Sequence, residues 1–176
     1  MIITVGGQAA SGKTTLAKVL AEKLSFKHLS AGVIMREMAK ERNVSLIEFS
    51  KYAEEHPEVD REIDERQKKL ARGDCVVDGR LSRHFLNPGL SIWLIAAAEV
   101  RTQRVLRRGE RYRTVGDARK DVITRDESER KRYMRYYKID LGDLSVYDLV
   151  INTDRFDIKQ MTAIALAAAT TLKDRK

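Results

Sequence analysis

The residues best suited to chemistry lie near the start of the chain, in a run of small residues around one lysine. Gly7 is followed after four residues by Gly12, Lys13 and Thr14. Small side chains let successive backbone N–H groups converge on phosphate oxygens. A helix beginning near Lys13 would add its positive N-terminal partial charge. The motif predicts a loop that binds a nucleoside triphosphate, with Lys13 on the β- and γ-phosphates and the Thr14 hydroxyl on Mg²⁺.

The whole loop is expected to surround the phosphates. Its nine candidate contact residues are Gly7, Gln8, Ala9, Ala10, Ser11, Gly12, Lys13, Thr14 and Thr15. A second motif, CVVDGR at 75–80, closes a short apolar run with Asp78. An acidic residue at the carboxyl end of a strand stands where ligands gather in open α/β sheets. We expect Asp78 to hold Mg²⁺ through water, although Asp-Gly is also a turn signal.

Short apolar runs predict the strands that position both motifs. These runs cover 2–5, 75–77, 91–96 and 149–151, with a weaker candidate at 27–30. Helical periodicity predicts helices over 14–24, 32–41, 46–55, 58–72, 99–108, 117–137 and 158–172. Strands alternating with helices indicate βαβ units, so we expect an α/β fold with a five-stranded parallel sheet and helices on both faces. Consecutive helices after the second strand, and the segment after the fourth, predict two flaps.

Composition indicates a single globular domain. The 176 residues are 43% hydrophobic and 34% charged, enough for a sizeable core. The lone Cys75 excludes an internal disulfide and fits a reducing compartment. The first residues show no basic secretory signal, and the apolar run at 163–172 is too short to span a bilayer. We therefore expect a monomeric cytoplasmic protein without a membrane partner.

The basic residues are concentrated in one segment. Residues 101–138 contain 14 Lys/Arg and 6 Asp/Glu, which accounts for the whole net charge of +8. The partner could be nucleic acid or the phosphates of a small nucleotide, and a solvated helix face is the plain alternative. Tyr133, Tyr136 and Tyr137 beside these arginines could stack on RNA. Their spacing is equally that of one buried helix face, which we favour.

The remaining motifs narrow the class of P-loop protein. No guanine-reading Asn-Lys-x-Asp motif is present, and no Ser/His/Asp or Cys/His set stands out. A small P-loop fold with two flaps and many arginines suits phosphoryl transfer to a small acceptor, because this chemistry is mainly positioning and charge neutralisation. A closing lid would exclude water as a competing acceptor.

Several segments resemble the archaeal type of cytidylate kinase among the P-loop nucleoside monophosphate kinases. They are SAGVIMREMAKER (30–42), EFSKYAEEHPEVDREIDERQ (48–67), VVDGRLS (76–82), ITRDESERKRY (123–133) and DLSVYDLVINTDR (143–155). The resemblance covers nearly the whole chain. It implies an ATP-dependent, Mg²⁺-requiring enzyme that converts CMP or dCMP to the diphosphate.

The resemblance also implies a domain layout. A single kinase domain would span 1–176, with its core at 1–30, 73–100 and 139–176. A helical insertion that binds the monophosphate would cover about 31–72, and an arginine-rich lid about 101–138. The loop reads GGQAASGKT, where related chains often carry prolines between the glycines. Alanine keeps the N–H groups, so phosphate binding should survive on a less rigid loop.

The resemblance assigns roles to charged residues. The expected catalytic residues are Lys13, Arg80, Arg125 and Arg132. The expected substrate-binding residues are Arg36, Asp78, Arg80, Asp126, Arg61 and Asp64. Asp126 is expected to accept from the exocyclic amine of cytosine, with Arg61 and Asp64 as rival base readers. One or two of the lid arginines Arg104, Arg107, Arg108 and Arg111 are expected to touch ATP phosphates.

Two alternatives remain. CMP, AMP and UMP carry the same phosphate group, so the loop and the arginines do not distinguish a CMP kinase from a kinase for AMP or UMP. A protein that binds ATP together with nucleic acid along 101–138 is the alternative from another class, although we disfavour a nucleic-acid partner. Its sign would be RNA or DNA affinity that falls steeply with salt.

Overall fold

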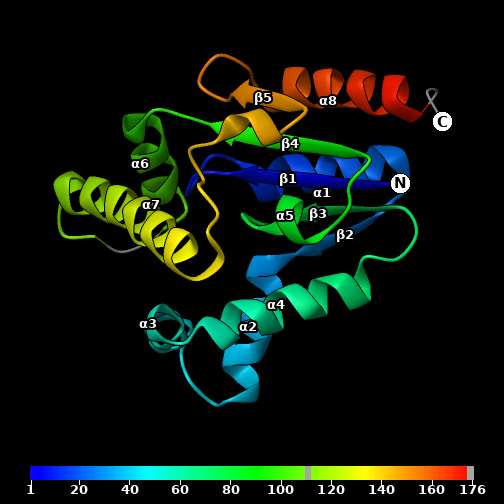
Figure 1. The fold of residues 1–176 in the computed structure, drawn as a ribbon. Helices are drawn as coiled ribbons and strands as arrows, with labels where there is room; N and C mark the ends of the chain where they lie inside the picture. The colour runs from blue at the N-terminus through cyan, green and yellow to red at the C-terminus, as the bar shows by residue number, and fades with distance from the viewer. Residues whose placement is uncertain (110–111, 174–176) are drawn as a thin grey trace.

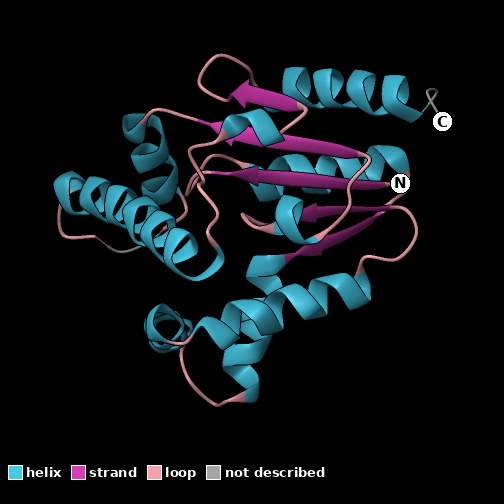
Figure 2. Ribbon diagram, in the orientation of Figure 1, coloured by secondary structure: helices cyan, strands magenta, loops and turns pink. Residues whose placement is uncertain are grey.

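In the computed structural model, which describes residues 1–109 and 112–173, helices cover both faces of a five-stranded sheet (Figure 1). All strands are parallel, in the order β2-β3-β1-β4-β5 (Figure 2). They are β1 (Ile2–Gly7), β2 (Lys27–Ser30), β3 (Cys75–Asp78), β4 (Leu90–Ile95) and β5 (Leu149–Asn152). Parallel strands need crossover connections, and helices provide them here. The expected α/β fold is confirmed.

The expected helices are present, with small differences at their ends. They are α1 (Lys13–Leu24), α2 (Ala31–Glu41), α3 (Leu46–Glu55), α4 (Pro57–Leu70), α6 (Ala98–Arg107), α7 (Val115–Tyr137) and α8 (Ile158–Lys173). The short helix α5 (Ser82–Phe85) and a 3₁₀ turn at Leu144–Val146 were not predicted. Each is about one turn long, which is too short to show a helical period.

Both faces of the sheet are buried. Ile3 and Val76 face α1 and α8 in the largest apolar cluster, which includes Leu16 of α1. The neighbouring strand residues Cys75 and Val77 lie in a separate cluster. Successive side chains of a strand point to opposite faces, so this division follows from the strand geometry. Burial on both faces explains why these strands read as continuous apolar runs.

Two helical insertions leave the sheet on the side where the strands end (Figure 1). The first insertion is α2–α4, between β2 and β3, and it has an apolar cluster of its own. That cluster contains Ile34, Met38, Phe49, Ala53, Val59 and Ile63. The second insertion is α6–α7, between β4 and β5, where Val105 packs with Val122. These insertions occupy the places expected for the two flaps.

Helix α7 begins before the predicted start at Asp117. The Thr114 side chain accepts from the Asp117 N–H, and the Asp117 carboxylate accepts from the Thr114 N–H. This capping box makes Thr114 the residue before the helix and Asp117 its third residue. An acidic residue that looked like a helix start is therefore part of a cap placed one turn earlier.

The strand order brings the two sequence motifs to one edge of the sheet. In the register of β1, Val5 lies beside Asp78 of β3, and Gly7 lies beside Leu94 of β4. The loop after Gly7 and the carboxylate of Asp78 therefore meet at the carboxyl ends of neighbouring strands, where ligands bind in open α/β sheets. No helix in the described part of the chain is both long and apolar enough to cross a membrane.

Candidate functional site

The loop between β1 and α1 has the backbone of a phosphate cradle. Gly7, Ala10 and Gly12 have φ values of 144°, 57° and 98°. A Cβ on Gly7 would lie 2.5 Å from the Leu94 carbonyl oxygen, so only glycine fits there. Left-handed geometry costs a non-glycine residue such as Ala10 about 1 kcal/mol. The loop accepts this strain in a tight turn between β1 and α1, the kind of backbone that binds anions in phosphate-binding loops.

Lys13 lies across this loop. Its Nζ donates to the carbonyl oxygens of Gly7 at 3.0 Å and Gln8 at 2.7 Å. Burial, together with the nearby charge of Arg80, holds the pKa of Lys13 well below its usual range. The Ser11 hydroxyl is buried at the same turn and has no hydrogen-bond partner among the described residues. A triphosphate fits this site because an anion would favour the charged lysine and give the hydroxyl a partner.

Thr14 and Asp78 form the candidate magnesium site. Thr14 Oγ1 donates to Asp78 Oδ2 at 2.7 Å, so the two expected ligands are in contact. Magnesium prefers oxygen ligands and is commonly held by one or two protein groups beside substrate phosphates. This donor set fits the ion. Asp78 also contacts Ser30 Oγ at 3.2 Å and His28 Nε2 at 2.7 Å.

Arg80 follows Asp78 and faces α7. Its two terminal nitrogens take different carboxylates: Nη2 lies 3.4 Å from Asp126 Oδ1, and Nη1 pairs with Glu129. The side chain is only 10% exposed. Burial lowers the pKa of Arg80 to about 10, and the charges of Arg125 and Arg132 act in the same direction. The site therefore concentrates positive charge beside the loop, as phosphate groups require.

The structure places Arg125 and Arg132 differently from each other. Arg132 is largely buried, with Nε 3.2 Å from Asp60 Oδ2 of α4. Arg125 is half exposed, with Nη1 3.9 Å from Asp121 of its own helix. Both lie close enough to Arg80 to lower its pKa, and Arg125 does the same for Lys13. Arg125 therefore lies near both Lys13 and Arg80, whereas Arg132 lies near Arg80, and both side chains hold other partners.

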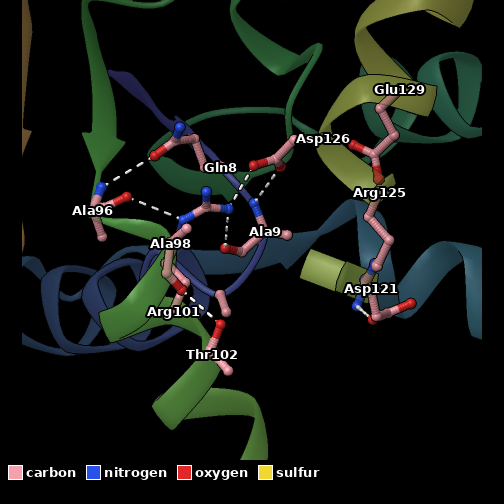
Figure 3. A network of polar contacts seen from close by, with 12 residues as sticks. Gln8, Ala9, Ala96, Ala98, Arg101, Thr102, Asp121, Arg125, Asp126 and Glu129 are labelled. Atoms are coloured by element: carbon pink, nitrogen blue, oxygen red, sulfur yellow. Dashed lines mark hydrogen bonds and ion pairs between the residues drawn. The ribbon is translucent and has the colours of Figure 1, made fainter. Parts of the chain in front are cut away.

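Asp126 occupies a position that the sequence did not suggest. One carboxylate oxygen accepts from the backbone N–H of Ala9 at 3.0 Å, and the other pairs with Arg101 Nη1 at 2.5 Å (Figure 3). Both oxygens are thus engaged at the phosphate loop. This differs from the expectation that Asp126 reads cytosine, because α7 brings the carboxylate to the donor side of the site.

The other substrate-binding candidates lie on the first insertion. Arg36 of α2 and Arg61 of α4 are exposed, whereas Asp64 of α4 is buried. Asp64 Oδ1 lies 3.4 Å from Gln67 Nε2, and its Oδ2 has no hydrogen-bond partner among the described residues. Arg61 and Asp64, the two rival base readers, therefore lie in different environments. Of these two, Asp64 is the buried one and presents an acceptor without a partner among the described residues.

We predict that stability depends on pH through Asp64. Burial raises its pKa to about 8, with a further contribution from Asp60. The stabilisation is fully present below the unfolded pKa of about 4 and is lost as pH rises through about 8. Asp64→Asn should therefore raise Tm at pH 9 by about 5 °C, or about 2 kcal/mol, and change it little at pH 5. Thermal scans at both pH values measure this.

The matched control is Glu65→Gln, which removes an exposed carboxylate that pairs with Lys68 on the same helix. Its effect on Tm should be small at both pH values. A Tm difference for Asp64→Asn that is the same at pH 5 and pH 9 would contradict the prediction.

A cleft of about 620 Å³ lies beside the loop, between α6 and the segment before α8. Its lining includes Ser11, Gly12, Arg104, Arg107, Arg108 and Phe156. Arg104 is fixed there, because Nη2 donates to the Thr153 carbonyl at 2.8 Å and Nη1 to the Ala10 carbonyl at 3.4 Å. Three of the four expected lid arginines thus border the cleft. Arg111 lies outside the described residues.

Sequence reasoning missed three partners of the site. From the sequence, Arg101 is treated only as part of the basic segment 101–138, because a helical arginine usually faces solvent. Arg101 lies three residues before Arg104 and seven before Arg108, so the three share one helix face, and this spacing was the available signal that they act together. Glu129 lies within the segment 123–133 that carries the resemblance, and no role is assigned to it from the sequence. His28 carries no motif of its own, and its contact with Asp78 depends on the pairing of β2 with β3.

Known proteins are similar to this chain over almost its whole length. Residues 2–155 match the model of the Cytidylate kinase-like family. The chain is 47% identical to the cytidylate kinase of Methanocaldococcus jannaschii, over 98% of this chain and 99% of that protein. It is 48% identical to the cytidylate kinase of Pyrococcus furiosus, over 96% of this chain and 88% of that one.

Solved structures share the fold at low sequence identity. An uncharacterized protein from Eubacterium ventriosum has a TM-score of 0.71 and 21% identity, covering 95% of this chain and 96% of that one. Shikimate kinase from Bacteroides thetaiotaomicron has a TM-score of 0.61 and 15% identity, covering 99% and 97%. The arrangement of sheet and helices therefore recurs in a small kinase of different sequence.

Proposed function

The chain belongs to the cytidylate kinase-like family, and from this premise we propose that it transfers the γ-phosphoryl group of ATP to CMP or dCMP, giving ADP and CDP or dCDP. The observation that carries the proposal is the phosphate loop with Lys13 across it and the Thr14–Asp78 pair beside it. The enzyme is an ATP-dependent phosphotransferase whose acceptor is itself a phosphate.

The donor side of the site supports ATP. The loop amides and Lys13 would hold the β- and γ-phosphates, and the cleft lined by Arg104 and Phe156 has room for the nucleoside. Thr14 and Asp78 would hold Mg²⁺, which supplies charge neutralisation on the donor phosphates when bound. These residues bind and orient the donor.

In the transfer, the bond between the γ-phosphorus and the bridging oxygen of ADP breaks, and a bond to a phosphate oxygen of the monophosphate forms. The acceptor oxygen is already ionised, so no strong general base is needed. Lys13, Arg80, Arg125 and Arg132 would stabilise the charge on the transferring group and on the leaving ADP. We assign them this role because the positive charges of Arg80 and Arg125 act on Lys13, and those of Arg125 and Arg132 act on Arg80.

The acceptor side is proposed to use both insertions. Arg36, which makes no ion pair among the described residues, and Arg80 would hold the acceptor phosphate. For base reading, Asp64 is the better candidate than Asp126 or Arg61, because its buried Oδ2 lacks a partner in the described part of the fold. A carboxyl oxygen there would accept from the exocyclic amine of cytosine, a donor that uracil lacks.

The contacts of the tyrosines in α7 weigh against a nucleic-acid surface. Tyr133 is buried, the Tyr137 hydroxyl donates to the Pro57 carbonyl at 3.1 Å, and the Tyr136 hydroxyl to the Glu54 carbonyl at 3.5 Å. They contact the first insertion, whereas a stacking platform needs open ring faces. The proposal therefore keeps small nucleotides as the partners. It assumes a monomer in the reducing cytoplasm, which suits the buried free thiol of Cys75.

The assignment is tested by measuring ADP formation with ATP, Mg²⁺ and each of CMP, dCMP, UMP and AMP. We expect kcat/KM for CMP or dCMP to exceed that for UMP by at least about tenfold, because a site that pairs with a substrate amine rejects the analogue lacking it. We expect CMP or dCMP to be preferred to AMP as well. Preference for AMP or UMP would overturn the substrate. Without acceptor-dependent turnover, salt-sensitive binding of RNA would support the nucleic-acid alternative.

A further inference from the structure

The Ala9 peptide of the phosphate loop is held on both sides by a charged pair from the second insertion (Figure 3). Its N–H donates to Asp126 Oδ1 at 3.0 Å, and its carbonyl accepts from Arg101 Nη1 at 3.3 Å. Arg101 Nη1 also donates to Asp126 Oδ2 at 2.5 Å. Arg101, Asp126 and Ala9 therefore close a ring of contacts around the backbone of one residue. We name Arg101 and Asp126 the loop bracket.

From this geometry we propose that the loop bracket positions the phosphate loop for ATP. Arg101 and Asp126 are then positioning residues, which act on the reaction through the loop without touching the transferring group. The inference rests on the function proposed above, since it assigns these residues to the donor site of that kinase. It also gives Asp126 a role different from base reading.

The bracket is itself anchored to the sheet. Arg101 is 5% exposed, and its Nε donates to the Ala96 carbonyl at 3.0 Å. The Ala96 N–H in turn donates to Gln8 Oε1 at 3.1 Å. The end of β4 therefore holds the two consecutive loop residues, Gln8 through its side chain and Ala9 through the guanidinium of Arg101. Buried charged hydrogen bonds of this kind fix geometry more strongly than neutral ones.

The sequence of this loop explains why a bracket is needed. Gly7, Ala10 and Gly12 all adopt positive φ. Ala9 and Ala10 restrict the unfolded backbone less than proline would, so the loop can also adopt many other conformations. A proline at position 9 would restrict φ covalently, but it has no N–H to donate. Here the Ala9 N–H is present and would be an unsatisfied buried donor without Asp126. Hydrogen bonds therefore supply the rigidity that the residue types do not.

Asp126 also lies 3.4 Å from Arg80, but Arg80 keeps a second carboxylate partner in Glu129. Loss of the bracket should therefore affect the donor much more than the acceptor. A purely structural role would instead lower stability and affect ATP and CMP alike. The difference between the two substrates is thus the diagnostic quantity.

The test measures the Kd of ATP with Mg²⁺ by calorimetry, without any acceptor, alongside KM for CMP and Tm. Asp126→Ala should weaken ATP binding about tenfold and change KM for CMP less than about threefold. Asp126→Asn keeps an oxygen for the Ala9 N–H but loses the charge opposite Arg101, so an intermediate loss is expected. The matched control is Glu127→Ala, the exposed next residue of α7, which should bind ATP like the wild type.

A double-mutant cycle with Ala9→Pro tests the coupling. The proline removes the N–H and fixes φ, so in that background Asp126→Ala should cost less than about twofold in ATP affinity. ATP affinity within twofold of wild type in folded Asp126→Ala would overturn the proposal; if that variant does not fold, the same result in Asp126→Asn would do so. Equal losses for ATP and CMP, or a loss in Glu127→Ala, would also overturn it.

The proposal and the function fail separately. If Asp126→Ala weakens ATP binding but the wild-type protein does not phosphorylate CMP, the proposed function is overturned and the bracket is supported. An active CMP kinase whose ATP affinity is independent of Asp126 would overturn the bracket and leave the function in place.

Discussion

Lys13→Met is expected to lower kcat for CMP phosphorylation by about a thousandfold. The Lys13 ammonium is held over the loop by the carbonyls of Gly7 and Gln8, where it can follow the charge that develops on the phosphoryl group. Methionine has a similar length and no charge, so it removes that stabilisation alone. KM for CMP should change little, because Lys13 lies on the donor side. Steady-state kinetics with both substrates varied measure the two effects.

The fold should tolerate this change. Burial already lowers the pKa of Lys13, so its replacement relieves a desolvation cost and Tm should stay the same or rise. Lys18→Met, at an exposed position of the same helix, is the matched control and should keep wild-type kcat. A loss of less than tenfold in Lys13→Met would contradict the catalytic role.

Arg80→Lys is expected to lower kcat/KM for CMP by about a hundredfold. Arg80 uses two nitrogens at once, one toward Asp126 and the other toward Glu129, in a largely buried position. An ammonium is a single point charge and does not keep both contacts while facing phosphate. The acceptor phosphate would lose its orientation, so the effect should appear in both kcat and KM. Initial rates over a range of CMP concentrations measure it.

Arg119→Lys is the matched control, because Arg119 is an exposed arginine of α7 that pairs with Glu99. Surface pairs contribute little, so this variant should behave like the wild type. The Tm of Arg80→Lys should fall modestly, since Glu129 keeps a weakened partner. If its kcat/KM stayed within threefold of the wild type, Arg80 would have no role in phosphate transfer.

The parts of the fold that sequence reasoning predicted are those encoded locally. The spacing of Gly7, Gly12 and Lys13 fixes a turn between a strand and a helix, because each residue type matches a backbone requirement within the motif itself. Buried parallel strands read as apolar runs, as in Cys75–Asp78 of β3. Local signals of this kind were sufficient for the sheet and for the placement of Asp78 beside Thr14.

The parts that escaped prediction depend on contacts between distant segments. Asp126 reaches Ala9 across 117 positions of sequence, and nothing around Asp126 indicates that crossing. Arg101 looked like a solvated helical residue, yet the end of β4 buries it. The start of α7 was misplaced because Asp117 is equally plausible as a first residue and as the third residue of a capping box. In each case the local sequence allows more than one structure, and contacts between distant segments decide which one forms.

The separate apolar cluster of the first insertion has a mechanical consequence. Phe49 and Val59 pack within α2–α4 and not against the sheet, so this unit can rotate as a rigid body without opening the main core. Such a rotation would take place about the junction of β2 with α2 at Ser30 and the short segment before β3, where the insertion joins the sheet.

The contacts that a rotation must exchange are mainly polar. They include the buried pair of Asp60 with Arg132, the Ser82 hydroxyl that donates to Gln67 Oε1 at 2.6 Å, and the Tyr136 and Tyr137 hydroxyls on the carbonyls of Glu54 and Pro57. Opening the acceptor side therefore exchanges a small set of polar contacts for water and leaves the hydrophobic interior intact. Substrate entry and product release should then occur on a timescale far shorter than that of global unfolding.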